Sequence, residues 1–153
     1  METSCLQAPP SLGRALNFTA SVTTALCQQM LAPHDLSLAQ WVVLSALWKR
    51  DGLSVADLAA FTGNNAPAIS RILDRMEQKA LVARSASLAD RRATHVFLSA
   101  GGEALRPLCS FWKQVNAALL DGFSEEETVL LFSLLARAEA NARRKLTAIP
   151  QQD

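Results

Sequence analysis

The sequence predicts a mainly α-helical protein with a small β-hairpin (α+β), arranged as a winged helix-turn-helix between N- and C-terminal dimerisation helices. Residues 54–78 read as a short helix, a tight turn and a second, amphipathic helix, which is the pattern of a helix-turn-helix. Two β-prone runs follow at 81–87 and 94–98, and a hairpin in that place is a wing. Half of the 153 residues are apolar and only 19% are charged, so part of the apolar surface is expected to be buried against a partner.

The N-terminal part is expected to hold a tail and two helices. Residues 1–10 contain two adjacent prolines and read as a flexible tail. Apolar residues at helical spacing predict a first helix over 12–31, which the sequence at 32–35 interrupts. Ser37 then starts a second helix, with Gln40 completing a capping box. This second helix is apolar almost all round, which predicts that it is central and buried.

The predicted helix-turn-helix begins at Ser54, which forms a capping-box-like start with Asp57. Gly63 interrupts the first helix, and Asn64 and Asn65 are turn formers that tolerate a left-handed backbone. Asn65 can cap the second helix. The buried face of that helix is predicted to comprise Ile69, Ile72, Leu73 and Met76.

The wing and the C-terminal helices complete the predicted order of elements. A polar turn at 89–92 joins the two strands of the wing. A long helix is expected over 99–121, with a bend near residues 103–107, because Pro107 removes one backbone hydrogen bond. Ser124 and Glu127 form another capping box, which opens the last helix.

Positive charge gathers on the predicted helix-turn-helix and wing. Residues 64–95 carry six lysines and arginines against three acidic residues, an excess of three, whereas the whole chain has a formal net charge of +1. The six cations are Arg71, Arg75, Lys79, Arg84, Arg91 and Arg92. A local basic surface on such a fold is typical of a DNA-binding domain.

The segments SRILDRMEQKALVAR at 70–84 and DRRATHVFLSAGG at 90–102 resemble the winged helix of the MarR family of bacterial transcription regulators. The resemblance extends over nearly the whole chain, because the length and the helix order also fit. The chain departs from the family at Ala80, where a glycine usually provides a left-handed C-cap, and at Ser99, where threonine is usual. The resemblance implies a cytoplasmic homodimer that is not an enzyme, needs no cofactor and binds a pseudo-palindromic double-stranded DNA operator, most often as a repressor. It also implies release by a small aromatic or phenolic effector.

The residues expected at the DNA lie at the start of the second helix, along its exposed face and in the wing. An asparagine can pair with adenine through two hydrogen bonds and an alanine can contact a thymine methyl group, although Asn65 could also serve only as a cap. Arg71 and Arg75 are expected to bind phosphate, with a solvated surface role as the alternative. In the resembled family the arginine that matches Arg92 enters the minor groove, and an acid like Asp90 fixes the wing. The expected DNA-binding residues are Asn64, Asn65, Ala66, Pro67, Ala68, Ser70, Arg71, Arg75, Asp90, Arg91, Arg92 and His95.

Three residues are candidates for the effector site that the resemblance implies. The ring of Trp41 could form an aromatic wall, and Arg14 and Arg106 could bind a carboxylate. A tryptophan at helical spacing can equally belong to the core.

Three scattered cysteines, Cys5, Cys27 and Cys109, suit a reducing compartment and do not predict a disulfide scaffold. A reactive thiol needs a positive neighbour, which Cys109 has within about a helical turn and Cys27 lacks. One branch of the resembled family senses hydroperoxides through a cysteine with tyrosine partners, and this chain contains no tyrosine. A thiol-based redox-sensing regulator remains an alternative function, as does a winged-helix protein-interaction module that does not bind DNA.

The sequence therefore divides into a tail at 1–10, dimerisation helices at 11–35 and 100–148, and a winged helix-turn-helix DNA-binding domain at 36–99. No run of about 18 apolar residues is present, so a membrane span is not expected. The two histidines do not cluster with other ligands, and no catalytic motif is present, so neither a metal site nor an enzyme is expected.

Overall fold

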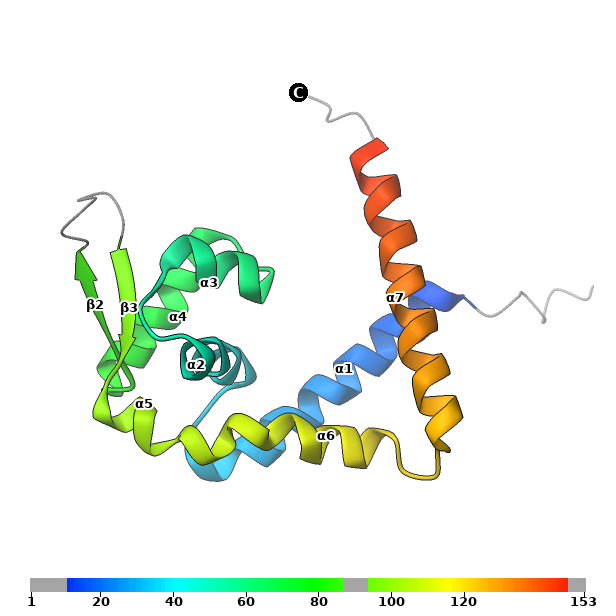
Figure 1. The fold of residues 1–153 in the computed structure, drawn as a ribbon, viewed down its shortest axis with the longest axis horizontal. Helices are drawn as coiled ribbons and strands as arrows, with labels where there is room; N and C mark the ends of the chain where they lie inside the picture. Colours follow the sequence, from blue (N-terminus) through cyan, green and yellow to red (C-terminus); the bar gives the residue numbers. More distant parts are fainter. Residues whose placement is uncertain (1–10, 87–93, 149–153) are drawn as a thin grey trace, which may run out of the picture. The chain divides into compact units, whose positions relative to one another are not determined.

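The computed structural model of the chain describes residues 11–86 and 94–148, and its contacts fall into two units, residues 1–109 and residues 110–153 (Figure 1). In chain order the first unit holds α1 (Leu12–Leu31), η1 (Ala32–His34), α2 (Leu38–Lys49), β1 (Leu53–Ser54), α3 (Val55–Thr62), α4 (Ala66–Gln78), β2 (Val82–Ala86), β3 (Thr94–Leu98), α5 (Ala100–Ala104) and most of η2 (Arg106–Ser110). The second unit holds α6 (Phe111–Leu119) and α7 (Glu125–Ala148). This order confirms the predicted fold class, a mostly helical chain with a small antiparallel sheet.

Side-chain caps start the helices of the first unit where the sequence predicts them. At α2 the Ser37 hydroxyl accepts from the Gln40 backbone N–H at 3.2 Å, and the Gln40 side chain accepts from the Ser37 N–H at 3.1 Å. Ser54 and Asp57 form the same reciprocal pair at α3. Each box satisfies backbone donors that a helix N-terminus leaves without a partner.

The core of the first unit confirms that α2 is central. Six of its twelve residues are buried, and α3, α4 and β3 all pack on it. The largest fully buried side chains of the described chain are Leu31, Val43, Leu44, Leu47, Leu58, Ile69, Leu73, Met76 and Val96. They come from α1, α2, α3, α4 and β3, so the helix-turn-helix and its sheet share one core.

The sheet has three strands in the order β1-β3-β2, one more than the sequence predicts. The additional strand β1 pairs antiparallel with β3, with Leu53 opposite Val96. The carboxylate of Asp51 supports this pairing because one of its oxygens accepts from the Gly52 N–H at 3.0 Å and from the Leu98 N–H at 2.9 Å. A two-residue strand gives no alternating pattern in the sequence, which explains why it is missed.

The single long helix predicted over 99–121 is wrong. The structure divides this segment into α5, the 3-10 helix η2 and α6, and Ser99 makes no side-chain cap to α5. Pro107 lies inside η2, where the missing N–H and the ring prevent a continuous α-helix. The Leu108 carbonyl instead accepts from the Trp41 indole N–H at 2.9 Å, so this segment is bonded to α2.

The end of α4 is as unusual as the departure at Ala80 suggests. Ala80 has φ of 53°, a left-handed conformation that costs an ordinary residue roughly 1–2 kcal/mol. The backbone beyond it packs directly on the start of α5: a Cβ on Gly101 would lie 2.6 Å from the Ala80 oxygen, and one on Gly102 only 2.2 Å from the Leu81 oxygen. Only glycine can occupy these two positions without moving the end of α4.

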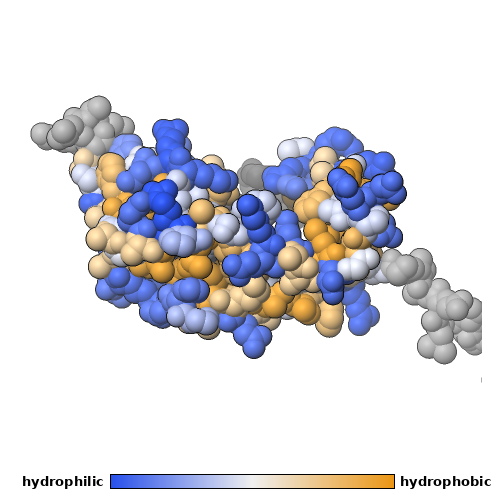
Figure 2. All heavy atoms as spheres, turned by 60° about the horizontal axis from the view of Figure 1, so that its bottom comes forward, coloured by the Kyte–Doolittle hydropathy of each residue, from blue (hydrophilic) through white to orange (hydrophobic). Residues whose placement is uncertain are grey.

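The second unit leaves much of its apolar surface exposed. Ser124 and Glu127 form the predicted capping box at the start of α7, at 3.1 and 2.8 Å. None of the described residues of α7 is buried. Its exposed large apolar side chains are Val129, Leu130, Phe132, Leu134, Leu135 and Leu146. The space-filling view likewise shows apolar side chains reaching the surface among hydrophilic ones (Figure 2).

Candidate nucleic-acid interface

The turn between α3 and α4 positions the start of the candidate recognition helix. Gly63 has φ of 70° and ends α3, a conformation that glycine adopts without strain. Asn65 is then the N-cap of α4, and its side-chain oxygen accepts from the Ala68 N–H at 2.9 Å. The cap occupies the oxygen that a two-bond pair with adenine would need, so the structure shows Asn65 in its capping role.

The expected DNA-binding residues of α4 lie on one side of a helix whose other side is fully buried. Ile69, Leu73 and Met76 have no exposed surface, whereas Ile72, also predicted for the buried face, is half-buried. The exposed residues at the N-terminal end and along the helix are Asn64, Asn65, Ala66, Pro67, Arg71 and Arg75. Ala68 and Ser70 are half-buried between the two sides. Packing therefore fixes which face of α4 is free for another molecule.

Two arginines of this exposed face carry charge that no acid offsets within the described residues. Arg71 Nε lies 3.4 Å from the Pro67 carbonyl oxygen, one turn earlier in the same helix. Neither Arg71 nor Arg75 forms an ion pair with any residue in the ranges 11–86 and 94–148. Exposed guanidinium groups on one helix face are suited to binding phosphate oxygens.

Two other cations of the basic segment are held by carboxylates, which the charge count does not reveal. Lys79 Nζ lies 2.9 Å from Asp35 Oδ2, joining the end of α4 to the turn before α2. Arg84, on β2, pairs with both Asp74 and Glu77 of α4. The charges available to a ligand on the described part of this surface are therefore those of Arg71 and Arg75, fewer than the sequence suggests.

The wing is described only in its strands. His95 is half-buried on the central strand β3, opposite Ser54 of β1 and Ser85 of β2. Asp90, Arg91 and Arg92, expected at the wing tip, lie outside the described residues.

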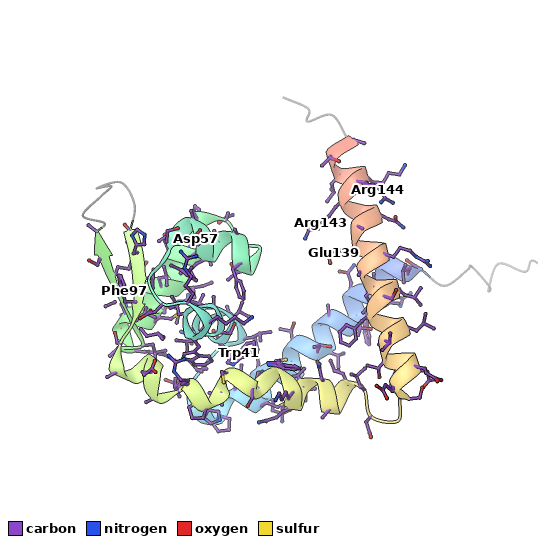
Figure 3. All side chains as sticks on the ribbon, in the orientation of Figure 1. Trp41, Asp57, Phe97, Glu139, Arg143 and Arg144 are labelled. Carbon is purple, nitrogen blue, oxygen red and sulfur yellow. The ribbon has the colours of Figure 1, made fainter. Side chains whose placement is uncertain are left out.

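Electrostatics near the sheet favour a charged carboxylate at the start of α3. Side-chain and backbone hydrogen bonds from Ser54 hold the pKa of Asp57 below its usual value against the opposing effect of desolvation, and the charges of Arg50 and His95 add smaller contributions that also lower it. Figure 3 labels Asp57 at this corner of the first unit. An ionised carboxylate here stabilises the N-terminal end of α3.

The three candidate effector residues are engaged in other contacts or exposed. Trp41, on α2 (Figure 3), donates to Leu108. Arg106 pairs with Glu103 and donates to the Trp48 carbonyl at 3.1 Å. Arg14 is exposed in the first turn of α1. None of these three side chains lines the cavity described next.

A cavity of about 660 Å³ does lie beside α4, and sequence reasoning did not identify it. It opens between the end of α1, the start of α2 and the C-terminal half of α4. Its lining includes Leu36, Gln40, Ile72, Arg75 and Lys79. Its residues come from α1, η1, α2, α4 and the loop before α2, which only folding brings together, and this explains why no sequence motif marks it.

Two kinds of feature are absent from residues 11–86 and 94–148. No helix in this part of the chain is long and apolar enough to cross a bilayer. No three histidine, cysteine, aspartate or glutamate side chains gather there into a group that could hold a metal ion.

These features define the class of protein: a helix-turn-helix whose second helix has one buried and one basic face, followed by a two-stranded wing that pairs with β1, is a winged helix-turn-helix protein. Residues 36–94 match the MarR family, and the solved structures described below are regulators of that family. Residues 36–94 are therefore identified as a MarR-family segment, and the chain is similar in fold to solved MarR-family regulators.

Three solved structures show the extent of this similarity. A mutant MarR from E. coli in complex with operator DNA has 26% sequence identity and a TM-score of 0.77, and the match covers 83% of this chain and 92% of that one. BpsR of Bordetella bronchiseptica, whose DNA binding is regulated by 6-hydroxynicotinic acid, has 28% identity and a TM-score of 0.75, covering 84% and 98%. MepR of S. aureus, solved in complex with DNA, has 22% identity and a TM-score of 0.82, covering 88% and 99%, and supports the fold.

Proposed function

We propose that this chain regulates transcription, most often as a repressor, by binding pseudo-palindromic duplex DNA as a homodimer. The observation that carries the proposal is the exposed face of α4, where Arg71 and Arg75 have no ion pair among the described residues while the opposite face is fully buried. Such a helix can enter the major groove with its N-terminal residues at the base edges and its arginines at phosphates. The MarR and MepR structures similar to this chain are complexes with DNA.

The exposed apolar residues of α1 and α7 support the homodimer. Phe18 and Val22 on α1 are exposed, as are six large apolar residues on α7. Exposed apolar residues of this kind are typical of a protein interface, and a second copy of the chain supplies the same residues. Two copies present two recognition helices, which address major grooves about 34 Å apart on one side of the duplex.

Salt-titrated DNA binding tests the proposal. The measurement is the affinity of the full chain for a pool of random 30-bp duplexes across a range of salt concentrations. Each phosphate contact that is lost lowers the slope of log affinity against log salt by about 0.9. We expect Arg71→Ala/Arg75→Ala to lower the slope by roughly 2 per protomer on this basis.

The matched control changes two arginines on another helix. Arg143 and Arg144 lie on α7 (Figure 3), and Arg143 pairs with Glu139 at 2.6 Å. Arg143→Ala/Arg144→Ala removes the same formal charge and should leave the slope at its wild-type value. Equal slopes in both double variants, or no retention of duplex by the wild type, would instead favour a protein-interaction module.

The cavity beside α4 supports a small aromatic acid as the effector. Its wall offers the apolar side chains of Leu36 and Ile72 and the cation Arg75, whereas Lys79, also in the wall, is paired with Asp35. A carboxylate bound to Arg75 would withdraw this arginine from phosphate, which links binding of the acid to release of DNA. Adding 6-hydroxynicotinic acid should raise the melting temperature of the wild type, and Arg75→Ala should reduce that rise. An equal rise in both proteins would place the acid elsewhere, with Arg14, Trp41 and Arg106 as the next residues to test.

A further inference from the structure

Arg84 joins the first strand of the wing to the recognition helix by three hydrogen bonds. Its backbone N–H donates to Glu77 Oε1 at 3.0 Å, and its Nε donates to Glu77 Oε2 at 2.9 Å. Its Nη2 donates to Asp74, one turn earlier on α4. One carboxylate of α4 thus holds both the backbone and the side chain of a single residue of β2.

These bonds act where the chain between the two elements is short and strained. Only residues 79–81 separate α4 from β2, and Ala80 among them is in the left-handed conformation. The direction in which β2 leaves α4 therefore depends on contacts made after the turn. Arg84 supplies such a contact from the third residue of β2, and β3 is paired with β2 along its whole length.

The surroundings of Arg84 differ from those of the two exposed arginines of α4. Its side chain is 23% exposed, compared with 36% for Glu77 and 57% for Asp74. Burial alone would lower the pKa of Arg84, but its hydrogen bonds to the two carboxylates and their charges outweigh burial and raise its pKa. Arg84, Asp74 and Glu77 together carry a formal charge of −1, so this cluster does not attract DNA by its net charge.

We infer that Arg84 is a positioning residue, which holds the wing at a fixed angle to the recognition helix through Glu77 and Asp74 and does not itself bind phosphate. The inference rests on the proposed DNA-binding function. A wing and a recognition helix that contact one duplex must be held in one relative orientation, because a small misplacement of either loses its contacts. The fork of the guanidinium suits this task since it reaches two carboxylates at once.

Substitutions on both sides of the contact distinguish positioning from phosphate binding. The probe is the 30-bp duplex that the wild-type protein enriches most from a random pool. The variants are Arg84→Met, Arg84→Lys, Glu77→Gln and the double variant Arg84→Met/Glu77→Gln. Arg75→Met, alone and combined with Glu77→Gln, is the matched control, because it removes an arginine that is exposed and has no ion pair among the described residues.

Glu77→Gln gives the sharpest expectation, because the two roles predict opposite signs. The substitution removes a negative charge near DNA, which by electrostatics alone would strengthen binding. If Arg84 positions the wing, losing its carboxylate partner weakens binding instead, by several-fold. Tighter binding of Glu77→Gln would overturn the inference, and this variant keeps an amide acceptor, so it tests the idea even if Arg84→Met fails to fold.

The remaining variants should follow the same logic. Arg84→Met should bind at least about tenfold more weakly, within the range of coupled side chains in contact. The double variant should bind no more weakly than Arg84→Met alone, whereas the Arg75→Met and Glu77→Gln losses should add. Arg84→Lys should recover only part of the affinity, because one ammonium group cannot reproduce the fork. Wild-type affinity of Arg84→Lys would show that only the charge matters and would overturn the inference.

Amide hydrogen exchange gives a readout without DNA. Arg84→Met should speed exchange in β2 and β3 and leave α1 unchanged, since the lost contacts lie between β2 and α4. Unchanged exchange in the strands would contradict the proposed positioning role of Arg84. If the wild type enriches no duplex, the proposed function fails and the role of Arg84 in DNA binding fails with it. Faster exchange in the strands would still show that Arg84 holds β2 against α4.

Discussion

Helices α4 and α7 both combine apolar with charged residues, but they differ in whether their apolar side chains are buried. In α4, Ile69, Leu73 and Met76 are fully buried by the rest of the first unit. In α7 none of the described residues is buried, and Leu130 and Leu134 are 57% and 43% exposed. Within this chain the apolar residues of α4 are buried and its polar face is free, whereas the apolar residues of α7 remain exposed.

The largest expected effect of this difference is on stability. Leu73→Ala should lower the free energy of unfolding by about 2–5 kcal/mol, because it removes a fully buried side chain and leaves a cavity. Denaturant unfolding at several protein concentrations measures the loss, which should not depend on concentration. Leu130→Ala, at the lowest workable concentration, is the control and should change stability by less than about 0.5 kcal/mol. Similar losses of stability in both variants would mean that Leu130 of α7 is buried by other residues of its own chain.

Charge on α7 should act on assembly instead of folding. Leu130→Glu/Leu134→Glu places two carboxylates on one side of α7, one helical turn apart. If that side meets a second copy, the dimer should weaken by at least about 3 kcal/mol, or roughly a hundredfold in dissociation constant. Sedimentation at micromolar concentration measures the change, beside circular dichroism to show that the helices persist. A variant that sediments like the wild type would remove this side of α7 from the interface.

Arg92→Ala, in the wing, should weaken DNA binding, whereas a substitution on the terminal helix α7 should not. This prediction rests on the sequence, because Arg92 lies outside the described residues. Loss of an arginine from the minor groove should weaken operator binding by roughly 1–3 kcal/mol, and Arg92→Lys should restore only part of it. Operator affinity at fixed salt is the measurement, with Arg143→Ala on α7 as the control that should stay at wild type. Full affinity in Arg92→Ala would end the minor-groove role, and a lower melting temperature would indicate a structural one.

The smallest expected effect concerns the thiols. Burial raises the pKa of the Cys27 thiol, so less of the reactive thiolate is present at neutral pH, whereas Cys109 is exposed. Iodoacetamide at pH 7.5 should therefore label Cys109 quickly and Cys27 slowly, with equal rates once the chain is unfolded in guanidinium chloride. Cys27→Ser should leave operator affinity and any peroxide response unchanged. Loss of a peroxide response in that variant alone would revive the redox-sensor alternative.

Local signals in the sequence predicted three helix starts correctly. Ser37, Ser54 and Ser124 each cap a helix through a partner three residues later, as their capping boxes indicate. Ser99 precedes α5 but makes no such bond. Caps depend on residues within one turn, which is why they can be read from the chain.

The interface was harder to predict because its charges are partitioned by distant contacts. Counting residues assigned equal value to six cations, but Asp35 holds Lys79 from forty-four residues away. Arg84 is held by Asp74 and Glu77 of α4, and these acids reach it only because the chain turns back after α4 and places β2 beside that helix. Spacing along the sequence identifies the exposed face of a helix, and folding decides which cations on it remain free.

The ties along the segment between β3 and α6 set a rule for building chimeras. Gly102 accepts from the Trp48 indole at 3.0 Å, Leu108 accepts from Trp41, and Arg106 donates to Trp48. Residues 100–109 therefore belong to the same unit as the winged helix, although they come after its last strand. A fusion that exchanges the C-terminal helices for those of a relative should therefore be joined after Cys109. A junction directly after Ser99 would remove residues 100–109 and their hydrogen bonds to the two tryptophans of α2.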